Sequence, residues 1–418
     1  MQIGPDGSFH LTYCTKVQPG HGWEQLFANL RTLVPALKAG LAPTRPFGLG
    51  LRLAADEADE LLAPGCLETF KNFLAAHDLY VFTLNGFPYG NLDGPEVKEQ
   101  IFAPDWREEA RLTYTLKLIE ILRRLLPAGT KGSISTLPLS YKTWISPGDN
   151  DSWRLLTGNL ARVAAKLMEV GAEDGLLIHL DLEPEPDGLL ECSAEVVSFF
   201  RDWLLKEGAA QLAGDTGISP AEARRGLLRH LNVCLDTCHL AVEFEEPEAA
   251  LAAYSWLGIR IGKVQVTSGL EVALPPGPES RAAAALQLEE FTRSPYLHQV
   301  VIKQVDGGRR QFRDLAEALP LMGETPGEVC RIHYHMPLFV DRHRLLGSTG
   351  DETRAVLRLL RERGFCRHLE IETYTWEWLP PDLKLDLLDS LHREYLWVLE
   401  ALGLEWEGPF TENRIYSG

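Results

Sequence analysis

The chain has 418 residues, and its 59 acidic residues outnumber its 41 lysines and arginines, which gives a formal net charge of −18. Hydrophobic residues make up 45% and charged residues 24%, a globular composition that excludes disorder and collagen-like repeats. The acidic balance argues against a nucleic-acid backbone or an anionic membrane surface as the main partner, because both select basic surfaces.

The sequence also lacks the signals of membrane insertion and secretion. No stretch approaches the roughly 20 apolar residues that a spanning helix needs. The start, MQIGPDGSFHLTYC, has no basic segment followed by an apolar run, so we expect no signal peptide. The seven cysteines are odd in number and irregularly spaced, which predicts reduced thiols and a cytoplasmic location.

Short apolar or β-branched runs alternate with longer amphipathic runs along the chain. Nine short runs are predicted strands, at residues 9–15, 47–53, 79–87, 132–140, 175–185, 231–239, 262–269, 330–337 and 368–375. Between them, segments such as WEQLFANLRTLVPALKAG and ETRAVLRLLRERG repeat apolar residues at three- and four-residue spacing, as helices packed on a sheet do. Repeated strand–helix units predict a parallel sheet, and their number favours an α/β (β/α)8 TIM barrel.

A (β/α)8 barrel needs eight strands, one fewer than the nine candidates. The segment from about 270 to 339 holds the surplus, including YLHQVVIKQVDGGRRQF, a predicted hairpin that turns at Asp306-Gly307-Gly308. No linker rich in proline, glycine or serine divides the chain. We therefore expect one barrel domain over residues 1–418, with an elaborated insertion before the last strand.

Polar residues gather toward the carboxyl ends of the later strands, where the active sites of such barrels are built. From the fifth strand to the eighth they are His179, Asp181 and Glu183, then Asp236 and His239, then Lys263 and Gln265, then Glu370 and Glu372. Burying so many ionisable groups is costly unless a cation compensates. Carboxylate and imidazole ligands together suit one divalent Mn, Mg, Zn, Co or Fe ion.

This order of side chains resembles the xylose isomerase-like, or sugar-phosphate isomerase/epimerase, TIM barrels. In that superfamily a Glu, an Asp, a His or Gln, and a Glu from strands five to eight bind one divalent metal. The resemblance implies that Glu183 and Glu372 are metal ligands and also the catalytic acid and base. Asp236 and Gln265 would complete the metal sphere, and His239 would contact the metal or the substrate.

The same chemistry follows from the residues alone. Isomerisation or epimerisation of a hydroxycarbonyl compound needs a base beside the carbonyl and a cation that stabilises the enediolate. Asn85 in the turn NGFPYG, Lys263 and His335 are further candidates for substrate contact. His333 and His335 share one strand face and could hold a second metal, contact the substrate, or be ordinary buried histidines.

A narrower resemblance covers nearly the whole chain. Eight blocks in order resemble the EboE family of metabolite traffic proteins: LTYCTKVQPG, LYVFTLNGFPYG, GSISTLPLS, EPEP, DTCH, YLHQVV, HYHMP and LEIETYTW. The resemblance implies a role in moving a small secondary metabolite or its precursor out of the cytoplasm, with a membrane partner from the same gene cluster, and implies no particular reaction. The first loop departs from the family at Gln18 and His21.

Other functions and plainer structural roles remain open. The barrel could bind a metabolite without catalysis, or act as an endonuclease IV-like phosphodiesterase, which DTCH and Asp341-Arg342-His343 suggest and the acidic charge disfavours. The structural alternatives are a helix cap for Asp236, a solvated loop for Glu183, an ion pair with Arg367 or Lys263 for Glu372, and a backbone-satisfied amide for Gln265. Glu185 is expected in solvent.

Overall fold

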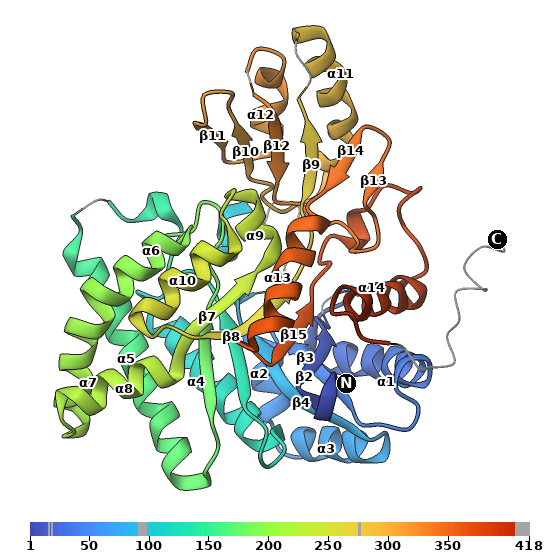
Figure 1. The fold of residues 1–418 in the computed structure, drawn as a ribbon. Coiled ribbons are helices and arrows are strands. Elements are labelled where there is room, and N and C mark those ends of the chain that lie inside the picture. Colours follow the sequence, from blue (N-terminus) through green and yellow to red (C-terminus); the bar gives the residue numbers. More distant parts are fainter. Residues whose placement is uncertain are drawn as a thin grey trace.

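The computed structural model describes residues 1–15, 17, 20–90, 98–146, 148–274, 277–325 and 327–405. Gln18 of the first loop lies outside these residues. Parallel strands form a barrel at the centre of the molecule (Figure 1). They are β2 (Phe9–Tyr13), β3 (Phe47–Arg52), β4 (Leu79–Asn85), β5 (Gly132–Thr136), β6 (Ile178–Leu182), β7 (Leu231–Asp236), β8 (Ile261–Val266) and β15 (His368–Ile371). The predicted (β/α)8 architecture is confirmed.

The order of the strands closes the sheet into a barrel. From one end to the other it runs β2-β15-β8-β7-β6-β5-β4-β3, and β1 (Gln2–Ile3) adds to β2 in the antiparallel direction. A parallel bridge between Cys14 and Gly50 joins the two ends of the sheet, so the barrel is nearly closed. The carboxyl ends of β6, β7, β8 and β15 therefore meet at one mouth.

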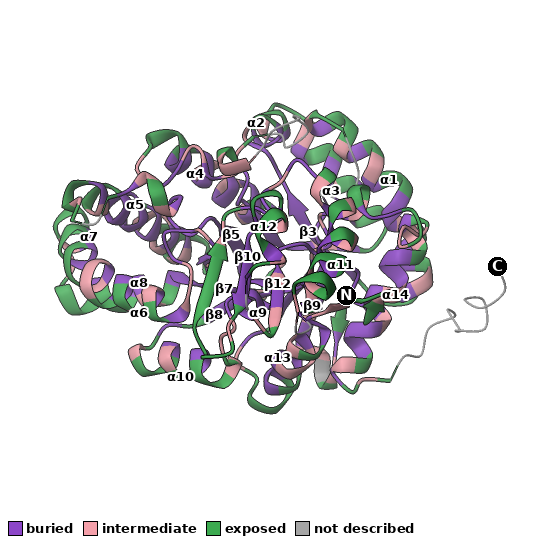
Figure 2. Ribbon diagram, turned by 90° about the horizontal axis from the view of Figure 1, so that it is seen from above, coloured by how far each residue is buried: buried purple, intermediate pink, exposed green. Residues whose placement is uncertain are grey.

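Helices cover the outside of the barrel. They are α1 (Gly22–Leu41), α2 (Ala55–Leu62), α3 (Cys66–Ala76), α4 (Glu109–Leu125), α5 (Asn150–Asp174), α6 (Ser193–Phe199), α7 (Ala209–Thr216), α8 (Pro220–His230), α9 (Thr237–Val242), α10 (Pro247–Leu257), α13 (Gly350–Arg363) and α14 (Leu387–Ala401). In α13 the buried Val356, Leu357 and Leu360 recur at helical spacing, which turns one stripe toward the sheet. Figure 2 shows buried residues facing inward and exposed residues on the outer rim.

The barrel interior contains charged side chains as well as apolar ones. Lys263 and Glu370 form an ion pair there, and Asp181 accepts one hydrogen bond from the Ser133 hydroxyl and pairs with the imidazole of His179. Gly50 leaves room for this polar layer, because a Cβ at this position would overlap the carboxylate of Glu370. The barrel core is therefore built partly on ion pairs that must be satisfied internally.

The segment between β8 and β15 folds into a second, antiparallel sheet above the barrel mouth (Figure 1). Its strands are β9 (Leu270–Ala273), β10 (Val300–Lys303), β11 (Arg309–Phe312), β12 (Val329–Ile332), β13 (Arg342–His343) and β14 (Leu346–Ser348), with helices α11 (Pro278–Leu288) and α12 (Leu315–Met322). We call this segment, residues 270–348, the insertion. It has an apolar cluster of its own, and β10 and β11 form the hairpin that the sequence predicted.

Two further findings concern membrane-spanning helices and the cysteines. Across the described parts of the chain, none of the helices combines the length and apolar character that crossing a membrane requires. The seven cysteines all lie in the described residues and none forms a disulfide, as the irregular spacing predicted.

Candidate metal centre at the barrel mouth

Asp236 and His239 are positioned by the junction of a strand and a helix. Asp236 ends β7 and caps α9, because its Oδ1 accepts a hydrogen bond from the His239 backbone N–H at 2.9 Å. The Thr267 hydroxyl donates to the same oxygen at 2.6 Å. These two bonds fix the carboxylate, and its buried Oδ2 has no hydrogen-bond partner. Asp236 therefore does cap a helix, as the structural alternative proposed, and its Oδ2 is still available to bind a metal.

Glu183 follows β6 directly and reaches the same place. Ligand atoms of Glu183, Asp236 and His239 all lie within 4.8 Å of one another. Oε2 of Glu183 is buried without a hydrogen-bond partner, as is Oδ2 of Asp236. Two unpartnered buried carboxylate oxygens are costly by themselves, and a cation between them would remove the cost. The donors present therefore fit a divalent metal.

Glu372, just after β15, lies in the wall of the same cavity as Glu183 but belongs to none of the three-ligand groups among the described residues. Its Oε1 accepts a hydrogen bond from Asn85 Nδ2 at 2.7 Å. Asn85 is held in turn by the Phe87 backbone N–H, which donates to its Oδ1 at 3.1 Å. The alternative of an ion pair between Glu372 and Lys263 is not observed, because Lys263 pairs with Glu370.

Gln265 and Lys263 lie on β8, which is paired with β7 and β15. Gln265 is in register with Asp236 of β7, and both of its amide atoms are buried without a hydrogen-bond partner. The alternative of a backbone-satisfied amide is therefore wrong. Lys263 is fully buried, donates to Ser135 Oγ at 3.2 Å, and is not part of the cavity wall. We predicted that Lys263 contacts the substrate. In this structure its positive charge acts on the carboxyl groups of Glu183 and Glu372.

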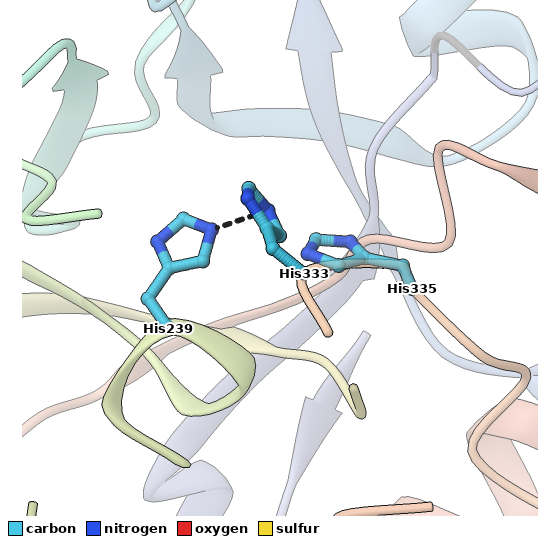
Figure 3. Close-up of side chains that lie close together, drawn as sticks. All are labelled: His239, His333 and His335. Atoms are coloured by element: carbon cyan, nitrogen blue, oxygen red, sulfur yellow. Dashed lines mark hydrogen bonds between the residues drawn. The ribbon is translucent and has the colours of Figure 1, made fainter. Parts of the chain in front are cut away.

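The insertion brings two more imidazoles to the mouth. His333 and His335 follow β12, and their ring nitrogens lie within 4.8 Å of one another and of His239 (Figure 3). His335 also groups with Asp236 and Cys238. The alternating His-x-His pattern was the sequence signal for His333 and His335, and it could not tell a barrel strand from an insertion. His343 of the Asp341-Arg342-His343 segment points elsewhere, toward Glu290 and Asp382.

The cavity at this mouth has a volume of about 90 Å³. Besides Asn85, Glu183, His239, His333, His335 and Glu372, its walls include Cys14, Val17, Arg52, Phe87, Lys98, Ile101, Phe102, Tyr296, Leu297, Gln299 and Tyr374. Glu185 is also in the wall and only 6% exposed, so the expectation that it is solvated was wrong. Gln299 of the insertion donates to the Pro186 carbonyl at 3.0 Å, so the insertion lies against the chain beside this carboxylate.

The electrostatics of the site follow from burial and crowding of carboxylates. Burial, with the charges of Glu370 and Asp236, raises the pKa of Glu372 to about 8. Burial, with the charges of Glu372 and Asp236, also raises the pKa of Glu183 well above its ordinary value, and Lys263 acts in the opposite direction. Without a cation these groups favour the protonated form, and a bound divalent cation would favour the carboxylates.

No family model matches the chain, and neither does any curated protein. Solved structures with a similar fold include a xylose isomerase-like TIM barrel protein from Mycobacterium smegmatis in complex with magnesium (12% identity, 94% of this chain and 98% of that chain, TM-score 0.47). Others are the IOLI protein with a zinc atom (12%, 94% and 98%, 0.46) and the probable 3-DHS dehydratase AsbF from Bacillus anthracis (12%, 92% and 98%, 0.42).

Proposed function

We propose that this protein is a divalent-metal-dependent enzyme of the isomerase or epimerase type, acting on a small hydroxycarbonyl or polyhydroxylated metabolite. One observation carries the proposal. Two buried carboxyl groups, Glu183 and Glu372, lie in the wall of one cavity, next to the unpartnered Oδ2 of Asp236 and the imidazole of His239. This combination offers an acid, a base and a cation site within a single enclosed space.

The residues would divide the work as follows. Glu183, Asp236 and His239 hold the metal, with Gln265 and Glu372 as predicted further ligands. A bound divalent ion supplies Lewis-acid stabilisation of negative charge on substrate oxygens. One of Glu183 and Glu372 removes the proton from the carbon beside the carbonyl, and the other returns a proton. Asn85 orients Glu372 through its hydrogen bond, and His335, the predicted substrate contact, lies in the wall of the same cavity.

The resemblance to the EboE family extends the proposal to the cellular role. The eight sequence blocks support a cytoplasmic protein whose metabolite is passed on to a membrane partner. In a non-catalytic version of that role, the cavity would bind the metabolite without changing it. Turnover distinguishes the two versions, because a carrier would bind a co-purified ligand and release it unaltered.

The experiment measures metal content and proton exchange on the same samples. Purified wild-type protein, Glu183→Gln and Glu372→Gln are analysed for bound metal, then incubated with a panel of sugars and hydroxy-ketones in D₂O. We expect about one equivalent of metal in the wild type and less in Glu183→Gln. Deuterium incorporation at the carbon beside the carbonyl should fall by 10²-fold or more in both variants.

A matched control separates these effects from the loss of any buried carboxylate. Glu243 is buried as well, and burial together with the charge of Glu191 raises its pKa to about 8, but it is not in the cavity wall. Glu243→Gln should therefore leave metal content and deuterium exchange unchanged. Equal and near-zero metal in the wild type and both cavity variants would reject the proposal.

A further inference from the structure

The three imidazoles at the mouth each use Nδ1 for a hydrogen bond to a carbonyl oxygen. His239 Nδ1 lies 2.9 Å from the Pro184 carbonyl, and His335 Nδ1 lies 2.5 Å from the Glu372 carbonyl. A backbone carbonyl only accepts hydrogen bonds, so both Nδ1 atoms carry the proton. In the neutral rings, Nε2 then has a free lone pair.

His333 reaches the same state through a side-chain amide. Its Nδ1 lies 2.8 Å from Gln299 Oε1. The orientation of this amide is determined, because Gln299 Nε2 donates to the Pro186 carbonyl at 3.0 Å and Oε1 must therefore face His333. The Nδ1 of His333 is thus also the protonated nitrogen, and its Nε2 is the free one.

The free nitrogens point at one another. Nε2 of His239 and Nε2 of His333 are 3.0 Å apart, the contact drawn as a dashed line in Figure 3. Two lone pairs at this distance repel unless a cation lies between them. A single proton could bridge this pair, but it would leave Nε2 of His335 unpartnered, and that atom is buried with no hydrogen-bond partner.

A carboxylate oxygen completes the arrangement. The unpartnered Oδ2 of Asp236 lies 3.9 Å from His239 Nε2 and 4.0 Å from His335 Nε2. Ligands around a tetrahedral zinc, with bonds of about 2.0–2.1 Å, are about 3.3 Å apart. Three of the six distances between these donors are 3.0, 3.9 and 4.0 Å, which bracket that value, and ligand nitrogens of the three imidazoles all lie within 4.8 Å of one another.

We propose that the insertion supplies two metal ligands, His333 and His335, which with His239 and Asp236 form a nitrogen-rich centre for Zn²⁺ or another zinc-like ion such as Co²⁺ or Fe²⁺. Three imidazoles and one carboxylate favour these ions over Mg²⁺, which prefers oxygen ligands and retains water. The carbonyl partners of the three Nδ1 atoms are the outer-shell acceptors that metal-binding histidines normally have.

The backbone around these histidines is well anchored for such a role. The His333 backbone N–H donates to the Gln299 carbonyl at 2.9 Å, and the Met336 N–H donates to the Ser268 carbonyl at 2.7 Å. The second bond ties the insertion to the chain that leaves β8. The two insertion ligands are thus held on both sides, so the centre joins the insertion to the barrel.

This inference rests on the proposed function only in placing a metal at the mouth, and its test is separate from turnover. Full-length protein is freed of metal with a chelator and then titrated with Co²⁺, whose binding is followed by visible absorption. Zn²⁺ is then added to compete with the bound Co²⁺. We expect about one equivalent of tight binding that millimolar Mg²⁺ does not displace. His333→Asn and His335→Asn should each weaken Zn²⁺ binding at least tenfold, and Gln299→Met should weaken it by roughly 10-fold or more through the lost acceptor.

The matched control is His343→Asn, which removes an imidazole of the same insertion that faces away from the centre; it should bind Zn²⁺ as the wild type does. If the histidine variants do not fold, X-ray absorption of the zinc-loaded wild type counts the ligands, and three imidazoles are expected. Unchanged Zn²⁺ affinity in His333→Asn and His335→Asn, a preference for Mg²⁺, one imidazole or fewer, or no metal uptake would overturn the inference. Proton exchange that needs Mg²⁺ and is unchanged in His333→Asn would support the isomerase proposal and contradict the zinc centre. Zn²⁺ binding without any proton exchange would support the zinc centre and contradict the isomerase proposal.

Discussion

Lys263 and Glu370 form an ion pair that is sealed inside the barrel, on the neighbouring strands β8 and β15. Neither side chain has any exposed surface, and the ammonium of Lys263 also donates to Ser135. Burial opposes the charge of Lys263, but the adjacent Glu370 raises the pKa of Lys263 above its ordinary value. Glu370 precedes Glu372 by two residues, and its charge is one of the causes that raise the pKa of Glu372.

Breaking this pair from one side should be strongly destabilising. Lys263→Met leaves the carboxylate of Glu370 buried without its partner, at a cost of about 3–5 kcal/mol in the free energy of unfolding. The double variant Lys263→Met/Glu370→Leu removes both charges and should recover most of that loss. Denaturant unfolding of the three proteins measures this. A single variant as stable as the wild type would show that the charges are not coupled.

Gly50 on β3 should not tolerate a side chain. An added Cβ would overlap Glu370 Oε1 and approach Thr12 Cγ2 at 2.8 Å. Overpacking of this kind typically costs about 1–3 kcal/mol, so we expect Gly50→Ala to lower the free energy of unfolding by that amount. The control is Gly214→Ala in α7, where nothing lies within 4 Å of the new Cβ. This control should stabilise the helix slightly.

Arg111 of α4 should be needed for the wall that carries Asn85. Its fully buried guanidinium donates to the carbonyls of Gly86 at 2.9 Å and Phe87 at 3.0 Å, and also to that of Pro104. Burial lowers the pKa of Arg111 to about 10, so the group stays charged at neutral pH.

We expect Arg111→Lys to destabilise the fold by about 2–3 kcal/mol, because one ammonium cannot serve three carbonyls in this geometry. Amide hydrogen exchange at Gly86 and Phe87 should become faster. Unfolding and exchange measurements on the same sample test both effects. Unaltered exchange in the turn would mean that other contacts hold it.

Glu394 predicts a specific dependence of stability on pH. It is 1% exposed, and burial raises its pKa to about 7, although Thr373 and the Leu338 N–H donate to it. Because this pKa is above the unfolded value of about 4.3, the folded state holds the extra proton between the two values. The stability that this proton contributes is therefore lost as pH rises through 7.

Glu394→Gln imitates the protonated group and does not titrate. Relative to the wild type, the variant should become about 2–3 kcal/mol more stable at pH 8 than at pH 5. Denaturant unfolding at both pH values, with a chelator present to remove metal linkage, measures the difference. A stability difference that is the same at pH 5 and pH 8 would contradict the assignment of Glu394.

The strands of the barrel were predictable, because each one is a short apolar run bounded by turn residues. The predicted strands extended past the carboxyl ends of the observed strands. The run 175–185 becomes a strand only over Ile178–Leu182, and Glu183 lies beyond it. A parallel strand ends where its backbone stops pairing with its neighbours, which depends on segments that a local pattern does not contain.

The sequence alone determined the alternation of elements, the closed parallel sheet and the strand-end origin of Glu183, Asp236 and His239, because periodicity and order along the chain are local properties. Only the tertiary structure decided that His333 and His335 come from a second sheet and meet His239, that Glu185 is buried, and that Lys263 pairs with Glu370. These results depend on how elements far apart in the chain pack together. The free energy of that packing depends on several segments at once, so no single segment predicts it.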